Sequence, residues 1–190
     1  MAVNGVARGA RLHKTVVLVG MMGAGKTAVG REMARRLGVP FLDSDEEIQR
    51  AAAMSIAEIF ARDGEAFFRK REAEVIARLM RAQRGILSVG GGAFLNAGTR
   101  EVISDLGVSV WLRADLELLW SRVKGKTTRP LLRTADPRAT LAALLDARAP
   151  HYALADVVVD SRAGYSIGDM AAKVLEALAA RPDVLEGYVA

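Results

Sequence analysis

The sequence predicts a three-layer α/β domain, in which helices cover both faces of a parallel β-sheet. Short runs rich in β-branched residues, such as residues 15–19 and 108–112, alternate along the chain with segments of helical character. The chain has 190 residues and 51% of them are apolar, which suits one domain with a sizeable core. Because consecutive parallel strands need a crossover between them, this alternation favours strands joined by helices.

Each predicted strand is a short apolar run that ends at a turn-forming or polar residue. Residues 15–19 end at Gly20, residues 41–42 lead into an acidic cluster, and residues 86–89 end at three glycines. Two further strands are expected at residues 108–112 and 156–159. Ligands of such sheets bind at the carboxyl ends of the strands, so the loops that follow these runs are the candidate sites.

The predicted helices are bounded by recognisable start and stop signals. The first helix, at about residues 26–37, ends before Gly38 and Pro40, and Ser55 with Glu58 has the spacing of a capping box. Residues 124–137 are polar and contain Gly125, Pro130 and Pro137, so we expect a loop there. The other helices are expected at about residues 45–53, 55–62, 65–81, 99–106, from 115 onward, 138–147 and 167–180.

Composition excludes several classes of function. The chain has no cysteine, which excludes disulfide scaffolds, thiol catalysis and cysteine-ligated metals, and it has only two histidines. No apolar run approaches the ~18 residues that a membrane span needs, and residues 1–14 lack the apolar stretch of a secretory signal. We therefore expect a cytoplasmic protein that is not bound to a membrane.

The net charge of +5 comes mainly from arginine, which accounts for 21 of the 27 basic residues. The guanidinium group binds phosphates and carboxylates with two parallel hydrogen bonds, so this composition suits small anionic ligands. Nucleic acid is disfavoured, because the basic residues do not form one run and aromatic residues are only 5% of the chain.

The strongest motif follows the first predicted strand and opens the first predicted helix. The segment Gly20-Met-Met-Gly-Ala-Gly-Lys-Thr27 matches G-x-x-x-x-G-K-[ST], the phosphate-binding loop. Polyphosphate needs several converging backbone N–H donors, and glycine lets the backbone curl tightly enough to supply them. Lys26 would reach the β- and γ-phosphates, and the Thr27 hydroxyl would ligate Mg²⁺.

Two further loops follow predicted strands, and each admits two interpretations. Asp43 and Asp45 could serve Mg²⁺ through water and bind a hydroxylated substrate, or they could cap a helix and provide its acidic first turn. The turn Gly90-Gly91-Gly92 could offer N–H donors to a ligand or be only a flexible turn.

Three arginines lie near these loops: Arg69, Arg129 and Arg148. For any single arginine, ordinary solvated surface is the more frequent environment. Arg129 also lies in the predicted loop of residues 124–137, from which it could deliver a cation to a phosphoryl group in transfer.

Taken in order, these residues resemble the shikimate kinase family. The series that carries the resemblance covers about residues 15–180 and consists of the phosphate-binding loop, Phe41-Leu-Asp-Ser-Asp45, Phe68-Arg69 with Glu72, Leu87-Ser-Val-Gly-Gly-Gly92, Arg129-Pro-Leu-Leu132 and Arg148-Ala-Pro-His-Tyr152. The resemblance implies an ATP-dependent kinase with the P-loop kinase fold, a five-stranded parallel sheet of order 2-3-1-4-5, and shikimate 3-phosphate and ADP as products. It also implies one kinase domain at 15–180 between tails at 1–14 and 181–190, with a substrate-binding segment at about 43–71 and a lid at about 123–136. Family members of this size are generally monomers, so we expect a monomer.

The resemblance also assigns roles to residues of this chain. The residues that would bind the nucleotide are Gly23, Ala24, Gly25, Lys26, Thr27, Ala28, Arg122 and Arg129. Those that would bind shikimate are Asp45, Arg69, Gly90, Gly91, Gly92 and Arg148. Mg²⁺ would be held by Thr27 and, through water, by Asp43 and Ser88. The catalytic residues would be Lys26, Asp45 as a general base and Arg129.

Other functions remain open at the level of sequence. A related small-molecule kinase, for instance one for gluconate, would share the loop, but an acceptor of different charge would not need both Arg69 and Arg148. A GTP-binding switch is disfavoured, because its Asn-Lys-x-Asp segment is absent: the only asparagines, Asn4 and Asn96, are not followed by lysine. A nucleic-acid-binding module is supported only by the basic charge.

Overall fold

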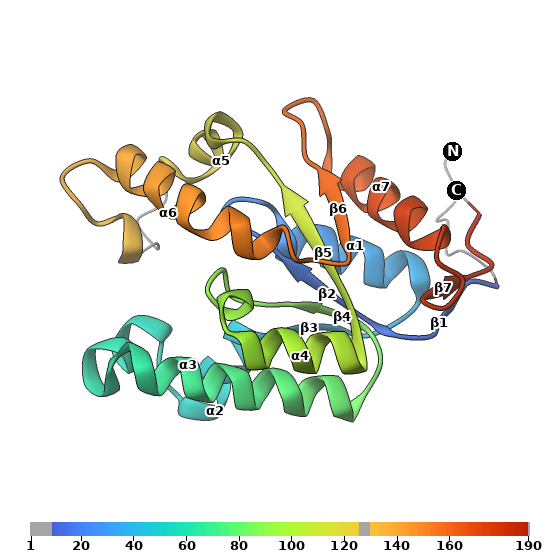
Figure 1. The fold of residues 1–190 in the computed structure, drawn as a ribbon, viewed down its shortest axis with the longest axis horizontal. Helices are drawn as coiled ribbons and strands as arrows, with labels where there is room; N and C mark the ends of the chain where they lie inside the picture. The colour runs from blue at the N-terminus through green and yellow to red at the C-terminus, as the bar shows by residue number, and fades with distance from the viewer. Residues whose placement is uncertain (1–8, 126–129, 190) are drawn as a thin grey trace.

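A computed structural model describes residues 9–125 and 130–189 and contains a five-stranded parallel sheet (Figure 1). Its strands are β2 (Thr15–Val19), β3 (Phe41–Asp43), β4 (Ile86–Ser88), β5 (Gly107–Arg113) and β6 (Val157–Asp160). They are arranged in the order β3-β4-β2-β5-β6. Counted along the chain, this is the expected order 2-3-1-4-5, so the predicted fold class is confirmed.

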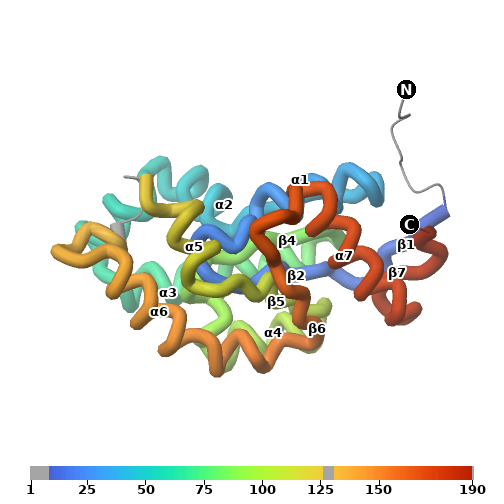
Figure 2. Tube along the Cα trace, turned by 90° about the horizontal axis from the view of Figure 1, so that it is seen from above, coloured from blue at the N-terminus to red at the C-terminus, as the bar shows by residue number. Residues whose placement is uncertain are grey.

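Helices cover both faces of the sheet. Figure 2 shows α1 (Lys26–Leu37) and α7 (Ile167–Ala179) packed together on one face and α4 (Ala97–Leu106) on the other. The remaining helical elements are α2 (Ser44–Ala52), α3 (Ile56–Ala82), α5 (Leu116–Val123), α6 (Pro137–Tyr152) and the short 3₁₀ turns η1 (Ala93–Leu95) and η2 (Pro130–Leu132). None of the described helices is long and apolar enough to cross a membrane.

The core is centred on β2, which has a neighbouring strand on each side and helices over both faces. Val16, Val17 and Leu18 are completely buried, as are their register partners Ile86 and Leu87 on β4. A strand buried on both faces is apolar throughout instead of alternating, which is the pattern that made residues 15–19 recognisable. The register also fixes the loop after β2 beside the carboxyl ends of β4 and β5.

Two helices differ from expectation, one by a kink where a break was expected and one by a later end. The expected break between residues 62 and 65 is a kink inside α3, where Gly64 has φ 83° and ψ 168°. The expected end of the later helix at residue 147 was wrong, because α6 continues to Tyr152 through Pro150. Proline removes one backbone donor in the last turns, and the complete burial of Tyr152 offsets that loss by removing a large apolar ring from water.

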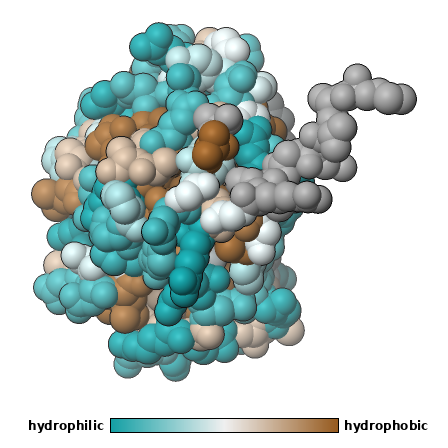
Figure 3. Space-filling view, turned by 90° about the vertical axis from the view of Figure 1, so that its right-hand side faces the viewer, coloured by the Kyte–Doolittle hydropathy of each residue, from teal (hydrophilic) through white to brown (hydrophobic). Residues whose placement is uncertain are grey.

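The two ends of the chain meet in a small antiparallel ladder. β1 (Arg11–Leu12) pairs with β7 (Leu185–Glu186), and Leu12, Val184 and Leu185 are buried. Sequence analysis gave no role to residues 181–190, whereas two of them belong to the core. The surface seen from this side of the molecule is mainly hydrophilic, with apolar residues scattered among polar ones (Figure 3).

Candidate active site

The loop between β2 and α1 has the backbone shape that phosphate binding requires. Gly20, Gly23 and Gly25 adopt φ angles of 136°, 82° and 95°, a region that side chains other than hydrogen disfavour. At Gly23 a side chain is also excluded by space, since a Cβ atom would lie 2.8 Å from Cγ1 of Val123. The loop therefore places its N–H groups around the N-terminus of α1, where a helix dipole favours an anion.

Lys26 lies across this loop. Its ammonium group donates hydrogen bonds to the carbonyl oxygens of Gly20 at 2.8 Å and Met21 at 3.1 Å. The positive charge is thereby held beside the loop that sequence analysis assigned to the phosphates.

The residues predicted to serve the metal lie together at the carboxyl ends of β3 and β4. The Thr27 hydroxyl donates to Oδ2 of Asp43 at 3.0 Å, and Asp43 is the register partner of Ser88, which is buried. The other oxygen of Asp43, Oδ1, accepts from the N–H groups of Asp45 at 3.0 Å and Glu46 at 3.4 Å and so caps α2. The capping interpretation is thus confirmed for Asp43, and its role toward Mg²⁺, for which Oδ2 would serve, stays a prediction.

This donor set fits Mg²⁺ that arrives with a nucleotide. No group of three or more histidine or acidic residues able to hold a metal occurs in the described part of the chain. Mg²⁺ usually keeps several waters and is bound by one or two carboxylates together with the phosphates of its substrate. One carboxylate and two hydroxyl groups, from Asp43, Thr27 and Ser88, match that mode of binding.

The triple-glycine turn brings together the residues predicted to bind the acceptor. A Cβ atom on Gly90 would lie 3.0 Å from Oδ1 of Asp45, one on Gly91 would lie 3.1 Å from Nη1 of Arg148, and one on Gly92 would lie 2.5 Å from Cζ of Arg69. Side chains from α2, α3 and α6 therefore converge on one turn after β4. Only glycine leaves room for all of them at this distance.

Arg69 is held in place by two acidic residues and two aromatic rings. It donates to Oε2 of Glu72 at 2.7 Å and to Oε1 of Glu65 at 3.2 Å. Its guanidinium carbon lies 5.1 Å from the ring centre of Phe68 and 5.8 Å from that of Phe60, distances typical of cation–π contacts. Burial disfavours the charge of Arg69, but Glu72 and Glu65 outweigh this effect and raise its pKa.

Glu72 is the buried carboxylate of the site. It is 2% exposed, and its Oε1 atom has no hydrogen-bond partner among the described residues. Burial raises the pKa of its carboxyl group, while the guanidinium of Arg69 acts in the opposite direction. Sequence analysis quoted Glu72 in the family series but gave it no role; the structure makes it the main partner of Arg69.

Arg148 has a different environment from Arg69. It is 8% exposed, yet no ion pair joins it to a carboxylate among residues 9–125 and 130–189. Its charge helps to lower the pKa of Glu72, and Tyr152 is a hydrogen-bond partner. Because no carboxylate of the described residues lies within ion-pair distance, the guanidinium is available to an anion supplied by a ligand. The solvated-surface alternative is thereby excluded for Arg148.

One pocket joins the phosphate-binding loop to part of the triple-glycine turn. A pocket of about 670 Å³ is lined by the phosphate-binding loop together with Asp43, Asp45, Ser88, Gly90 and Gly91. Its other end is formed by Arg122 and by Ala163, Tyr165, Ser166, Ile167 and Met170. Arg122 donates to the carbonyl oxygen of Gly23 at 3.1 Å and to the Ser161 hydroxyl at 3.4 Å, so it links the loop to this end of the pocket.

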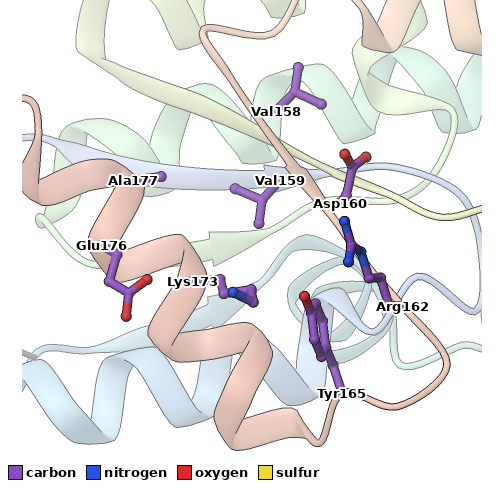
Figure 4. A pocket seen from close by; sticks show the side chains of 8 residues that line it. All are labelled: Val158, Val159, Asp160, Arg162, Tyr165, Lys173, Glu176 and Ala177. Atoms are coloured by element: carbon purple, nitrogen blue, oxygen red, sulfur yellow. The ribbon is translucent and has the colours of Figure 1, made fainter.

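Sequence analysis missed the segment 163–167 at this end of the pocket. It follows β6, the last strand of the sheet, and its position at a strand's carboxyl end was the available signal. A second hollow of about 480 Å³ lies on the other side of this segment, between β6 and α7 (Figure 4). There Arg162 and Lys173 approach the ring of Tyr165 at 6.0 and 5.0 Å, and no predicted site residue lines it.

Arg129 lies outside the described residues, as does Lys126 of the expected lid. The predicted role of Arg129 therefore stays a prediction. On either side of it, α5 ends at Val123 and η2 begins at Pro130.

Comparison with known proteins agrees with the family resemblance of the sequence. A family model described as "Shikimate kinase" matches residues 22–179. Curated shikimate kinases from Cereibacter sphaeroides and Ruegeria pomeroyi are 65% and 66% identical over 177 residues, which is 93% of this chain and 88% and 91% of theirs. A solved shikimate kinase from Acinetobacter baumannii, in complex with shikimate, has a TM-score of 0.84 and 39% identity, and the match covers 88% of this chain and 93% of that one.

Proposed function

The chain belongs to the shikimate kinase family, and we propose on this premise that it transfers the γ-phosphoryl group of ATP to the 3-hydroxyl of shikimate. The products are shikimate 3-phosphate and ADP, in the route to chorismate and the aromatic amino acids. The observation that carries the proposal is the convergence of Arg69, Arg148 and Asp45 on the triple-glycine turn, of which Gly90 and Gly91 line the same pocket as the phosphate-binding loop.

The nucleotide is bound mainly by the loop after β2. The N–H groups of residues 23–28 surround its phosphates, and Lys26 exchanges its contacts with Gly20 and Met21 for β- and γ-oxygens. Arg122 and the segment 163–167 enclose the base and ribose at the other end of the pocket. Arg129 supplies a further cation to the phosphoryl group in transfer.

Mg²⁺ would be bound as part of the Mg-ATP substrate, where it would offset the charge of the β- and γ-phosphates. The hydroxyl of Thr27 would hold it directly, and Asp43 and Ser88 would hold it through water. The 3.0 Å hydrogen bond between Thr27 and Asp43 supports this arrangement, because it holds a hydroxyl oxygen and a carboxylate oxygen side by side.

The acceptor is bound by complementary charge and by hydrogen bonds to its hydroxyl groups. The guanidinium groups of Arg69 and Arg148 receive the carboxylate of shikimate, and both arginines approach the same turn. Asp45 accepts hydrogen bonds from the hydroxyl groups, while the N–H groups of the turn donate to them. Asp45 also takes the proton of the 3-hydroxyl as that oxygen bonds to the γ-phosphorus atom and ADP leaves.

We further propose that the domain contains two parts that close over the substrates. Residues 43–71 contain a separate small apolar cluster of Ile48, Ile59 and Phe68, which supports their movement as a unit. Residues 123–136 would close over the nucleotide and exclude water from the transfer. The whole chain from 15 to 180 acts as one kinase domain, as a monomer in the cytoplasm, where ATP is available.

The experiment that tests this function is the release of ADP from Mg-ATP with purified protein. Shikimate, gluconate and no acceptor are compared, with GTP in place of ATP as a further control. The proposal predicts release that depends on shikimate and on ATP. Release that depends on gluconate instead would keep the phosphate-binding loop but remove the roles of Asp45, Arg69 and Arg148.

A further inference from the structure

We propose that Tyr152 is a positioning residue, whose hydroxyl group fixes the peptide between Gly91 and Gly92 so that the Gly92 N–H can donate to the acceptor substrate. This inference rests on the proposed function, because it concerns the acceptor end of the same pocket. It extends that function by giving a role to a buried tyrosine that does not line the pocket.

The carbonyl groups of the triple-glycine turn are held by different partners. The carbonyl oxygen of Gly90 accepts from the Ala93 N–H at 3.0 Å, and that of Gly92 accepts from the Leu95 N–H at 3.2 Å. Both bonds belong to the backbone turn that leads into η1. The Gly91 carbonyl lies between them and accepts from the Tyr152 hydroxyl at 2.5 Å. Its orientation therefore depends on a side chain from α6.

A peptide group is planar, so fixing one end of it fixes the other. The Gly91 carbonyl and the Gly92 N–H belong to the same trans peptide and point in opposite directions. Glycine on both sides makes rotation of this peptide inexpensive, because neither residue has a Cβ atom to restrict it. Without the Tyr152 bond, the direction of the Gly92 N–H would therefore be poorly determined.

The N–H groups of Gly91 and Gly92 have no hydrogen-bond acceptor among the described residues. The Gly90 N–H donates to the Ser44 hydroxyl at 3.4 Å, but those of Gly91 and Gly92 donate to no acceptor among residues 9–125 and 130–189. Gly92 also lies against the guanidinium of Arg69, so its donor adjoins the group that receives the substrate carboxylate. Oriented donors beside a fixed cation form a suitable site for a hydroxylated anion.

Tyr152 is itself held firmly enough to do this. It is completely buried, its ring lies 5.8 Å from the ring of Trp111, and its hydroxyl also contacts Sδ of Met21 at 3.8 Å. Trp111 in turn packs against Gly20 of the phosphate-binding loop, where a Cβ atom would lie 3.3 Å from Cδ1 of the indole. Through Trp111, Tyr152 thus links the triple-glycine turn to the phosphate-binding loop and fixes the position of one relative to the other.

Tyr152 and Arg148 also meet at this turn. They are one helical turn apart on α6, and a Cβ atom on Gly91 would lie 3.1 Å from Nη1 of Arg148 and 3.5 Å from the Tyr152 hydroxyl. Burial raises the pKa of Tyr152, although the guanidinium of Arg148 opposes this rise, so the phenol stays protonated and remains a donor near neutral pH. The tyrosine could therefore act through Arg148 instead of Gly91, and the experiment must separate the two.

The test is Tyr152→Phe, which removes the hydroxyl and retains the ring. We expect the KM for shikimate to rise about tenfold, the factor that one hydrogen bond supplies, while the KM for ATP and the melting temperature stay near those of the wild type. Tyr188→Phe is the matched control, since Tyr188 only packs against the core away from the pocket, and it should leave both KM values unchanged. A KM for shikimate unchanged in Tyr152→Phe, or equal rises in both KM values, would overturn the proposal.

A double-variant comparison separates action through Gly91 from action through Arg148. In an Arg148→Lys background, Tyr152→Phe should still lower kcat/KM for shikimate by about the same factor as in the wild type. Loss of the effect in that background would assign it to Arg148 and overturn the role of the Gly91 peptide. Wild-type protein whose ADP release ignores shikimate would instead refute the proposed function itself.

Discussion

Replacing Arg148 by methionine should separate acceptor binding from folding. Methionine keeps an unbranched apolar stem of similar length and removes only the charged head. Because Arg148 is buried and forms no ion pair among the described residues, the free protein loses no salt bridge in this variant. The variant does lose the attraction between Arg148 and Glu72 and the hydrogen bond with Tyr152, so the free energy of unfolding should fall by about 1–2 kcal/mol at most.

The cost should appear when shikimate binds. A guanidinium that binds a carboxylate with two hydrogen bonds contributes about 1.5–3 kcal/mol for each of them. The lower end of that range gives about 3 kcal/mol, which corresponds to a factor of roughly 100 in affinity. The KM for shikimate should therefore rise by about two orders of magnitude, while the KM for ATP should change little because the proposed nucleotide site is the phosphate-binding loop.

The assay is steady-state ADP release, with each substrate varied while the other is saturating, together with thermal unfolding of the free protein. The result that refutes this reasoning is a similar rise in both KM values, which would place Arg148 away from the acceptor. A loss of thermal stability much larger than that of these two contacts would contradict the second part, since it would mean that the charge has a further role in the fold.

Three further substitutions test other residues. Lys26→Ala should lower kcat by at least about a hundredfold, and near-normal kcat would contradict a kinase mechanism. Gly92→Ala should raise the KM for shikimate with little change in that for ATP, because its Cβ atom would lie 2.5 Å from Cζ of Arg69; unchanged kinetics would show that this approach is unimportant. Arg35 and Arg36 lower the pKa of Glu32 from 4.5 to about 2, so its stabilising effect is present above pH 4.5 and is lost as the pH falls towards 2. Denaturant titrations should show that Glu32→Gln loses less stability than the wild type over that interval, and equal losses would count against the ion pairs.

The parallel sheet could be predicted because its strands are buried on both faces. Residues 15–19 and 108–112 are apolar except for Thr15 and Ser109, which are also buried, and each run ends near a glycine or a polar turn. The phosphate-binding loop was recognisable for a related reason, since positive φ angles at Gly20 and Gly25 demand glycine at fixed spacing. Features that depend on local backbone geometry therefore leave a readable pattern.

Contacts between residues far apart in the sequence left no such pattern. The bond from Tyr152 to Gly91 joins residues 61 positions apart, and it depends on α6 continuing past Pro150, where local rules predict an end. The pairing of β1 with β7 joins the two ends of the chain through strands of two residues each, too short for hydrophobic periodicity to detect. The role of Glu72 likewise depends on its burial, which the sequence does not display.

The proposed reaction moves the phosphoryl group from ATP to the 3-hydroxyl of shikimate. The most direct measurement is a phosphorus–proton correlation spectrum of the product formed from Mg-ATP and shikimate. Our account predicts one new phosphate ester whose phosphorus atom couples to the proton on carbon 3, formed in equal amount to ADP. A phosphate on another hydroxyl, or free inorganic phosphate as the only new species, would contradict it.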